Sequence, residues 1–245
     1  MRGVVRTRWK EYTGPLEGPA VPCLYNDIRG KTTIAWGNLV DSVAAVVGLP
    51  FVWPDGRRAT AAEIAAAWQS VHNDRQAAIR GWTYAATLTP LRLTPEGIEG
   101  LVWGRLDSND RILSARVPDW EDKPACAQMA LHSLAWACGA NAHFPRMFQA
   151  VADGDYETAA IESHMNEWTP EGIHNKGLIP RNVAQKTLLR NAGRVRDFHL
   201  DPDLIDWTHD LSVSGAPTQP SPLAEEVTGS GGIVHVSRYE PEPDE

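Results

Sequence analysis

The spacing of apolar residues along the chain predicts a mainly helical protein with one small β-sheet near its N-terminus. A short helix is expected over residues 6–14, ending where Gly14 precedes Pro15. A proline disfavours helical geometry in the residue that precedes it. Between residues 22 and 41, two runs of β-favouring side chains flank the polar turn 26–30. This pattern is typical of an antiparallel hairpin.

Helical periodicity dominates the rest of the chain. Thr60, followed three residues later by Glu63, is typical of a capping box and begins a helix that we expect to run to about residue 80. The segment 124–138 is apolar nearly all round, which indicates a helix in the middle of a bundle. A further helix is expected to begin at Thr94 and to carry Leu106 on its apolar face, and others are expected near 144–152, 155–167 and 181–196. The predicted fold class is α+β, with a small antiparallel β-hairpin or sheet lobe and a mainly helical bundle.

Composition marks where the folded part is expected to end. From residue 201 onward Pro, Ser, Gly, Asp and Glu dominate, so we expect residues 201–245 to form a mostly flexible tail. Residues 1–200 are interpreted as one domain. Within it, 1–58 hold the N-terminal helix and β-lobe and 59–200 the helical lobe.

Charge and cysteine usage exclude several classes of function. The formal net charge of -8 argues against nucleic acid as a partner, because phosphate binding calls for a clustered basic face. No apolar run approaches the roughly 18 residues of a membrane span, and the N-terminus lacks the apolar run of a signal peptide. We therefore expect no integral membrane segment and synthesis in the cytoplasm. The three cysteines lack metal-ligand spacing, so we expect three buried thiols and no metal or other cofactor.

Two carboxylates and a threonine hydroxyl are concentrated near the N-terminus. Glu17 follows the first predicted helix, Asp27 lies in the hairpin turn and Thr33 on the returning strand. Glycoside cleavage needs a protonated carboxyl group to donate to the leaving oxygen and an ionised one to organise the attacking group. Glu17, beside apolar Leu16 and Pro15, is the better candidate for the protonated acid, and Asp27 for the ionised group.

This segment resembles the catalytic segment of phage-type lysozymes, glycoside hydrolase family 24. Their signature runs Glu-Gly, then Tyr-x-Asp-x-x-Gly-x-x-Thr-Ile-Gly-x-Gly-His. The matching positions are Glu17, Gly18, Tyr25, Asp27, Gly30, Thr33, Ile34 and Gly37. Ala35 stands where the signature has a glycine and Asn38 where it has a histidine, which supports the structure in the family. The spacing from Glu17 to Asp27 is one residue longer than expected.

The resemblance implies a lysozyme-like fold and an N-acetylmuramidase, a peptidoglycan hydrolase that cleaves the MurNAc-GlcNAc β-1,4 glycosidic bond. It implies that Glu17 is the general acid and that Asp27 with Thr33 positions the attacking water. Fainter similarity continues at 127–136, 153–160 and 177–185. Arg181 in the last stretch matches an arginine that can face the acid across the cleft. The partner would be a peptidoglycan glycan strand, reached as an endolysin after release or as an effector after injection.

Aromatic residues beside the motif are candidates for sugar contact. A flat apolar ring face suits a pyranose ring, and both Tyr25 and Trp36 lie in the segment that carries the motif. We therefore include both, with Arg181, among the expected substrate-binding residues.

Each of these residues also has an ordinary structural interpretation. Asp27 can make an Asx turn before Gly30, Thr33 can be a plain strand residue, and Arg181 can form an ordinary ion pair. Glu11 is a rival for the acid because it lies near the same helix end.

Two other functions remain open. The first is a catalytically inactive, lysozyme-derived wall-binding or particle-assembly module, favoured by the changes at Ala35 and Asn38 and by an acidic charge that suits an anionic wall poorly. The second is a lysozyme-fold enzyme that acts on another glycan, such as chitin oligomers.

Overall fold

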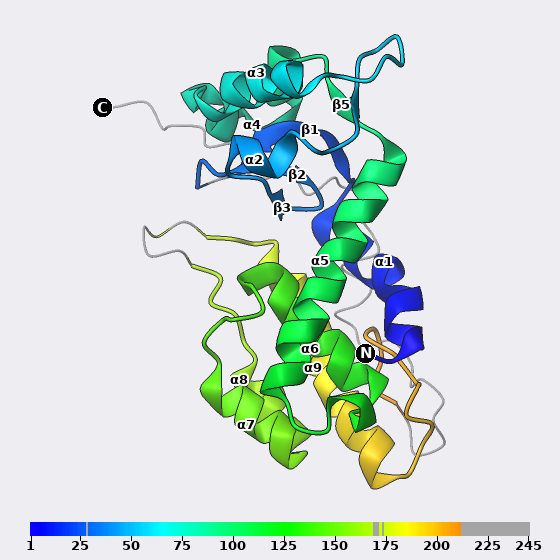
Figure 1. The fold of residues 1–245 in the computed structure, drawn as a ribbon. Helices are drawn as coiled ribbons and strands as arrows, with labels where there is room; N and C mark the ends of the chain where they lie inside the picture. Colours follow the sequence, from blue (N-terminus) through cyan, green and yellow to red (C-terminus); the bar gives the residue numbers. More distant parts are fainter. Residues whose placement is uncertain (28, 169–171, 173, 212–245) are drawn as a thin grey trace, which may run out of the picture. The chain divides into compact units, whose positions relative to one another are not determined.

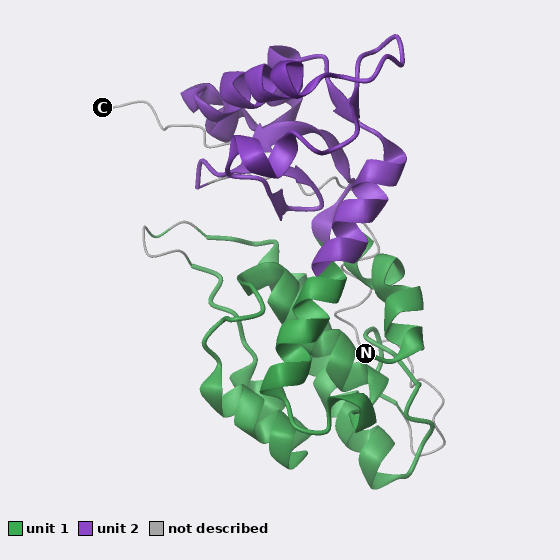
Figure 2. Ribbon diagram, viewed as in Figure 1, with its two compact units in different colours: residues 1–16, 106–231 green, residues 17–105, 232–245 purple. Residues whose placement is uncertain are grey.

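The computed structural model describes residues 1–27, 29–168, 172 and 174–211 (Figure 1). The chain divides into two compact units (Figure 2). Unit 2 is Glu17–Arg105, and unit 1 combines Met1–Leu16 with the described residues from Leu106 onward. The predicted α+β class is confirmed: in the described ranges helices predominate, with one three-stranded and one two-stranded antiparallel sheet.

The main sheet of unit 2 contains the predicted hairpin. β1 (Val21–Asn26) pairs with β2 (Thr32–Ala35), and β2 pairs with a short β3 (Asn38–Leu39), all antiparallel. The register sets Tyr25 opposite Thr33. The hairpin prediction over 22–41 is confirmed, and β3 extends it to a third strand.

Shorter elements of unit 2 were not predicted. α2 (Val43–Val46) follows the sheet, and β4 (Phe51–Val52) pairs with β5 (Arg92–Leu93). Strands of two residues are too short to produce a periodic pattern, so the sequence carried no signal for this second sheet.

The helix expected from residue 60 to 80 is two helices in the structure, α3 (Ala61–His72) and α4 (Arg75–Leu88). The predicted capping box is present, because Thr60 and Glu63 each bond the other's backbone N–H. The break comes at Asp74, whose carboxylate accepts hydrogen bonds from the N–H groups of residues 76 and 77 and so begins α4. Gly81, at φ 73°, then bends α4.

Helices α3 and α4 pack on the sheet of unit 2 (Figure 1). The indole N–H of Trp68 on α3 donates to the Val40 carbonyl at 2.7 Å. The buried residues that form this core include Leu24, Ile34, Phe51, Ile64 and Val71. The structure therefore groups α3 and α4 with the β-lobe, whereas the sequence interpretation grouped 59–200 as a helical lobe. The apolar face of α3 covers the sheet, a pairing that periodicity alone does not identify.

Unit 1 is built around α6 (Ala125–Cys138), whose residues are buried from Ala125 to Trp136. This confirms the prediction of a central helix. α9 (Leu178–Asp197) packs on α6, and α8 (Tyr156–Glu162) packs on both α9 and α7 (Pro145–Asp153). Of the three thiols expected to be buried, Cys23 and Cys126 are, but Cys138 is exposed because it ends α6.

Two further helices have residues in unit 1. α5 runs over Pro95–Arg116 and so continues past Leu106, on its predicted apolar face. α1 runs over Gly3–Glu17 and contains Pro15, so the predicted end at Gly14 is wrong. A proline within the last turn removes one helical hydrogen bond but does not stop the helix. Glu17 is therefore the last residue of α1 rather than a residue beyond it.

A half-buried carboxylate of α5 anchors the 3-10 helix η1 (Trp120–Asp122) in unit 1. Asp110 Oδ1 accepts a 2.8 Å hydrogen bond from the Trp120 indole and lies 3.3 Å from His132 Nε2. Burial alone would raise the pKa of Asp110, but these two neighbours outweigh burial and lower the pKa to about 2.

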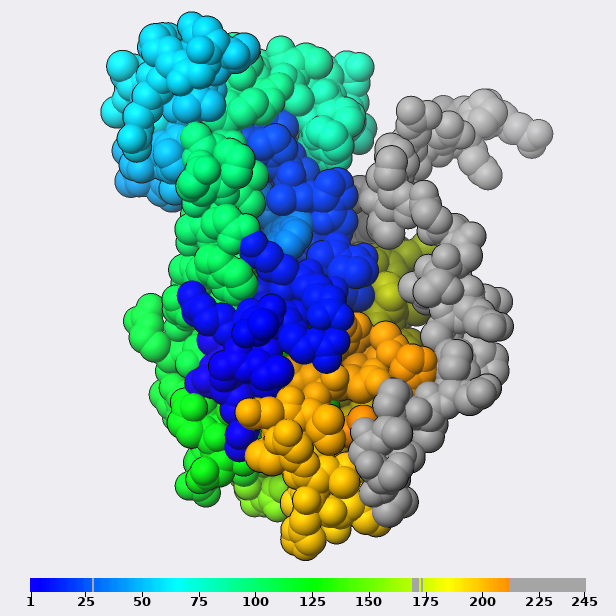
Figure 3. Space-filling model, turned by 90° about the vertical axis from the view of Figure 1, so that its right-hand side faces the viewer, coloured from blue at the N-terminus to red at the C-terminus, as the bar shows by residue number. Residues whose placement is uncertain are grey.

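The segment expected to be a flexible tail begins as packed structure. Leu211 is buried, and its N–H donates to Asn191 Oδ1 at 2.8 Å. Arg8 on α1 donates to the Ile205 carbonyl at 2.7 Å, and Figure 3 shows this segment in orange beside blue α1. Residues 201–211 thus differ from the expectation, because their polar groups are matched by partners on α1 and α9. Residues 212–245, the rest of the expected tail, lie outside the described residues. In the part of the chain that the structure describes, no helix has the length and apolarity to cross a membrane.

Candidate functional site

The candidate site is built where the end of α1 meets the turn between β2 and β3. Glu17 ends α1, and Gly18 turns the chain at φ 72°. The indole N–H of Trp36, in the β2–β3 turn, donates to the Gly18 carbonyl at 2.8 Å. This hydrogen bond ties the turn to the residue directly after Glu17. The half-buried Trp36 side chain therefore helps to position the acid segment.

The Glu17 carboxylate lies against this turn. Gly37 has φ 67°, a conformation that favours glycine, and a Cβ added there would lie 3.6 Å from Glu17 Oε2. The glycine of the motif thus lets the backbone turn next to the carboxylate.

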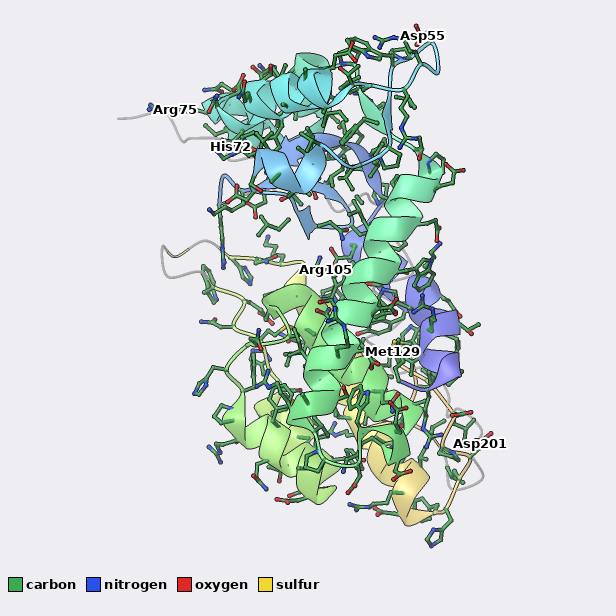
Figure 4. All side chains as sticks on the ribbon, in the orientation of Figure 1. Asp55, His72, Arg75, Arg105, Met129 and Asp201 are labelled. Carbon is green, nitrogen blue, oxygen red and sulfur yellow. The ribbon has the colours of Figure 1, made fainter. Side chains whose placement is uncertain are left out.

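Arg105 is a site residue that the sequence analysis missed. It lies on α5 and is labelled in Figure 4. Its Nη1 donates to the Gly37 carbonyl at 2.8 Å and would be 3.9 Å from a Cβ added at that glycine. Arg105 and the Glu17 carboxylate therefore lie around the same point of the turn. The sequence carried no signal for this, because α5 is far from the motif along the chain and has no pattern that marks this arginine.

Tyr25 on β1 lies within electrostatic reach of both candidate carboxylates. Burial raises the pKa of the Tyr25 phenol to about 12, and the negative charges of Glu17 and Asp27 contribute in the same direction. A hydrogen bond from the Gly37 backbone acts weakly in the opposite direction. The phenol therefore stays neutral at physiological pH, and the structure brings Glu17, Tyr25 and Asp27 together.

Asp27 organises the loop between β1 and β2. Its Oδ1 accepts hydrogen bonds from the N–H groups of Arg29 at 2.9 Å and Lys31 at 2.8 Å. The Asx-turn interpretation is therefore correct for this oxygen. Neither of these two hydrogen bonds uses Oδ2.

Thr33 and Asp27 meet at one backbone oxygen. The Thr33 hydroxyl and the Asp27 N–H each donate to the Lys31 carbonyl, both at 2.9 Å. Thr33 is 4% exposed, and its hydroxyl lies on the same hairpin end as the Asp27 loop. The expected pairing of these two side chains is compatible with this geometry, since a hydroxyl that donates one bond can still accept another.

The two substituted positions of the lysozyme signature differ in their structural setting. Ala35 is buried at φ 55°, in the left-handed region that favours glycine, which is the residue the signature has there. Asn38 is 6% exposed, and its side-chain amide donates to the Leu101 carbonyl at 3.2 Å. Asn38 thus ties β3 to α5, which is a structural role.

Arg181 lies in unit 1, in the buried core of the helices. It is 2% exposed, and its Nη1 lies 3.1 Å from Ser133 Oγ, which accepts a 2.6 Å hydrogen bond from the Tyr12 hydroxyl. Since Arg181 and Glu17 belong to different units, the expectation that they face each other stays a prediction. The rival acid Glu11 is exposed and forms an ion pair with Arg8 at 2.8 Å.

Within the described ranges, no cluster of three or more His, Cys, Asp or Glu side chains is suited to hold a metal ion. In comparisons with known proteins, no family model, curated protein or solved structure matches the chain. The function is therefore inferred from the residues of unit 2 themselves.

Proposed function

We propose that this protein is a peptidoglycan hydrolase of the N-acetylmuramidase type, which cleaves the MurNAc-GlcNAc β-1,4 bond with the carboxylates of Glu17 and Asp27. The observation that carries the proposal is that one short sheet positions both carboxylates: Glu17 Oε2 lies against Gly37 in the β2–β3 turn, and Asp27 shares the Lys31 carbonyl with Thr33 of β2. Two carboxyl groups in one small site, in different surroundings, are the requirement of acid-assisted glycoside cleavage. We further propose that the enzyme acts on the cell wall after release or injection.

In the proposed reaction, Glu17 donates a proton to the leaving glycosidic oxygen. Asp27 Oδ2 and the Thr33 oxygen accept hydrogen bonds from a water, which attacks the anomeric carbon from the opposite face while Asp27, as the general base, takes up the proton that the water loses. Because a water and not a carboxylate is the nucleophile, the reaction inverts the configuration at that carbon. The neutral Tyr25 phenol can donate a hydrogen bond to a sugar hydroxyl or to either carboxylate.

One alternative is favoured by specific contacts. Arg105 lies at the same turn as Glu17 and holds the turn through the Gly37 carbonyl, which is a structural role. Asp27 is also engaged in its loop through Oδ1. Both contacts suit a lysozyme-derived module that binds the wall or a particle without cleaving glycan.

The two functions are separated by peptidoglycan digestion with wild type, Glu17→Gln and Asp27→Asn, followed by mass spectrometry of the fragments. The muramidase releases fragments with free muramic-acid reducing ends. Each substitution should lower that rate by roughly 10²-fold or more, the usual contribution of a positioned acid or base. Asn at position 27 retains an acceptor oxygen for the loop, so its effect reports on the chemistry rather than on the turn.

Glu11→Gln is the matched control, because Glu11 is a second glutamate of α1 and the rival acid. It should cleave at the wild-type rate. The muramidase proposal fails if folded wild type releases no reducing ends, or if Glu17→Gln cleaves as fast as wild type. Digestion of chitin oligomers in parallel tests the alternative glycan, and cleavage of those oligomers with intact peptidoglycan would favour it.

A further inference from the structure

An exposed tryptophan of unit 1 stacks on a histidine ring. Trp168 is 55% exposed, the most exposed of the described tryptophans, and it stacks on His174 with ring centroids 4.3 Å apart and planes 8° from parallel. The two residues also pair through an antiparallel backbone bridge. The stack covers one face of the indole, and at 55% exposure much of the Trp168 side chain remains accessible to a ligand.

Polar groups anchor this stack to α9. Glu167, next to Trp168, accepts a 3.1 Å hydrogen bond from Asn182 Nδ2, and its Oε2 lies 3.6 Å from His174 Nε2. Asn182 is itself fixed by two 3.0 Å hydrogen bonds with the backbone of Met165. The ring pair is therefore pre-organised, so little conformational entropy is lost when a ligand binds.

A small pocket adjoins the same asparagine. It measures about 230 Å³, below the range of drug-sized sites, and is therefore suited to one substituent rather than to a whole ligand. Its polar lining comes from Ser163, His164, Asn182 and Lys186. Asn182 thus borders the pocket on one side and holds Glu167 on the other.

We propose that Trp168, His174, Glu167 and Asn182 form a carbohydrate-binding platform, on which the apolar face of an N-acetylhexosamine ring stacks against Trp168. A flat indole matches the C–H face of a pyranose, while carboxylate, imidazole and amide groups at its edge match the hydroxyl and acetamido groups. The choice of glycan rests on the proposed function, but the platform lies in unit 1 and uses none of the proposed catalytic residues.

Polar neighbours distinguish this platform from a protein-docking surface. A protein interface centres on a well-packed apolar cluster with charged groups depleted at its core. Here the groups that contact or hold the ring pair are a carboxylate, an imidazole and a carboxamide. The geometry therefore favours a ligand that presents an apolar face ringed by hydroxyl groups, which describes a sugar.

The test uses the full chain carrying Glu17→Gln, so that the glycan stays intact during the measurement. The N-acetylglucosamine hexamer is titrated into this protein and its affinity is measured by isothermal titration calorimetry. Trp168→Ala should weaken binding by roughly tenfold, as expected for the loss of an aromatic contact. His174→Ala should weaken binding by a smaller factor, and His174→Phe, which retains a ring for the stack, should restore most of it.

Trp82→Ala is the matched control, because Trp82 is 41% exposed and lies on α4, in unit 2. It should bind the hexamer as the parent does, and the thermal midpoints of all variants should agree. The platform is refuted if Trp168→Ala and the parent bind equally, if Trp82→Ala weakens binding as much, or if the folded parent does not bind the hexamer. Failure of the muramidase proposal has a different signature, since it shows as uncleaved peptidoglycan whatever the affinity for the hexamer.

Discussion

Replacing Ala35 with glycine tests the backbone strain at the end of β2. Ala35 is 1% exposed and has φ 55°, where an L-residue loses roughly 1–2 kcal/mol relative to glycine. The substitution also removes a buried methyl group, a loss of about 0.8 kcal/mol. The additional freedom of glycine in the unfolded chain adds a loss of about 0.4–1 kcal/mol. These contributions nearly cancel, so the free energy of unfolding should change by less than about 1 kcal/mol.

Ala85→Gly is the matched control in the same unit. Ala85 is fully buried on α4, so glycine there loses the methyl group and about 1 kcal/mol of helix propensity without relieving strain. Urea unfolding followed by circular dichroism should show Ala85→Gly destabilised by about 2 kcal/mol and Ala35→Gly close to wild type. The strain argument is refuted if both variants lose the same free energy.

Three further predictions concern the stability of each unit. Ser133→Ala removes a fully buried hydroxyl that bonds two side chains. Urea unfolding should show that the free energy of unfolding falls by about 2 kcal/mol. The control Ser70→Ala, at an exposed serine, should lower it by less than about 0.5 kcal/mol. Equal losses would contradict the buried network. Asp110 has a pKa of about 2, below its unfolded value of about 3.9, so its stabilisation is complete above about pH 4 and is lost as the pH falls through 2. Asp110→Asn should therefore be less stable than wild type by on the order of 2 kcal/mol at pH 7, and a gap that persists unchanged at pH 2 would exclude this carboxylate as its source. Arg105→Met removes the charge-assisted hydrogen bond to the Gly37 carbonyl and should lower the free energy of unfolding by about 1–2 kcal/mol. An unchanged urea midpoint would show that the guanidinium does not hold the turn.

Local sequence signals determined many of the elements of this protein. The capping box at Thr60 was predicted from residues within one helical turn, and it is present. The hairpin was read from β-favouring runs on either side of a polar turn, and the central position of α6 from a segment that is apolar all round. Each signal depends on side chains a few residues apart. The local structure that such a signal predicts therefore depends little on the rest of the fold.

The candidate site is partly of this local kind. Glu17, Tyr25, Asp27 and Thr33 lie in one short segment, so the sequence could assign them to a single constellation before their contacts were known. Two features of the site became visible only in the structure. They are the left-handed backbone of Ala35 and the hydrogen bonds that Asp27 Oδ1 accepts within its own loop.

Only the tertiary structure decided which distant segments meet. It brought Arg105 to the turn beside Glu17, paired β4 with β5, grouped α3 with the sheet and fixed residues 201–211 against α1 and α9. Such contacts depend on how apolar faces and buried polar groups find partners far along the chain. The residues next to one another in the sequence do not determine which distant segments pair, because many pairings would bury the same side chains. The packing of the whole unit selects one of these pairings.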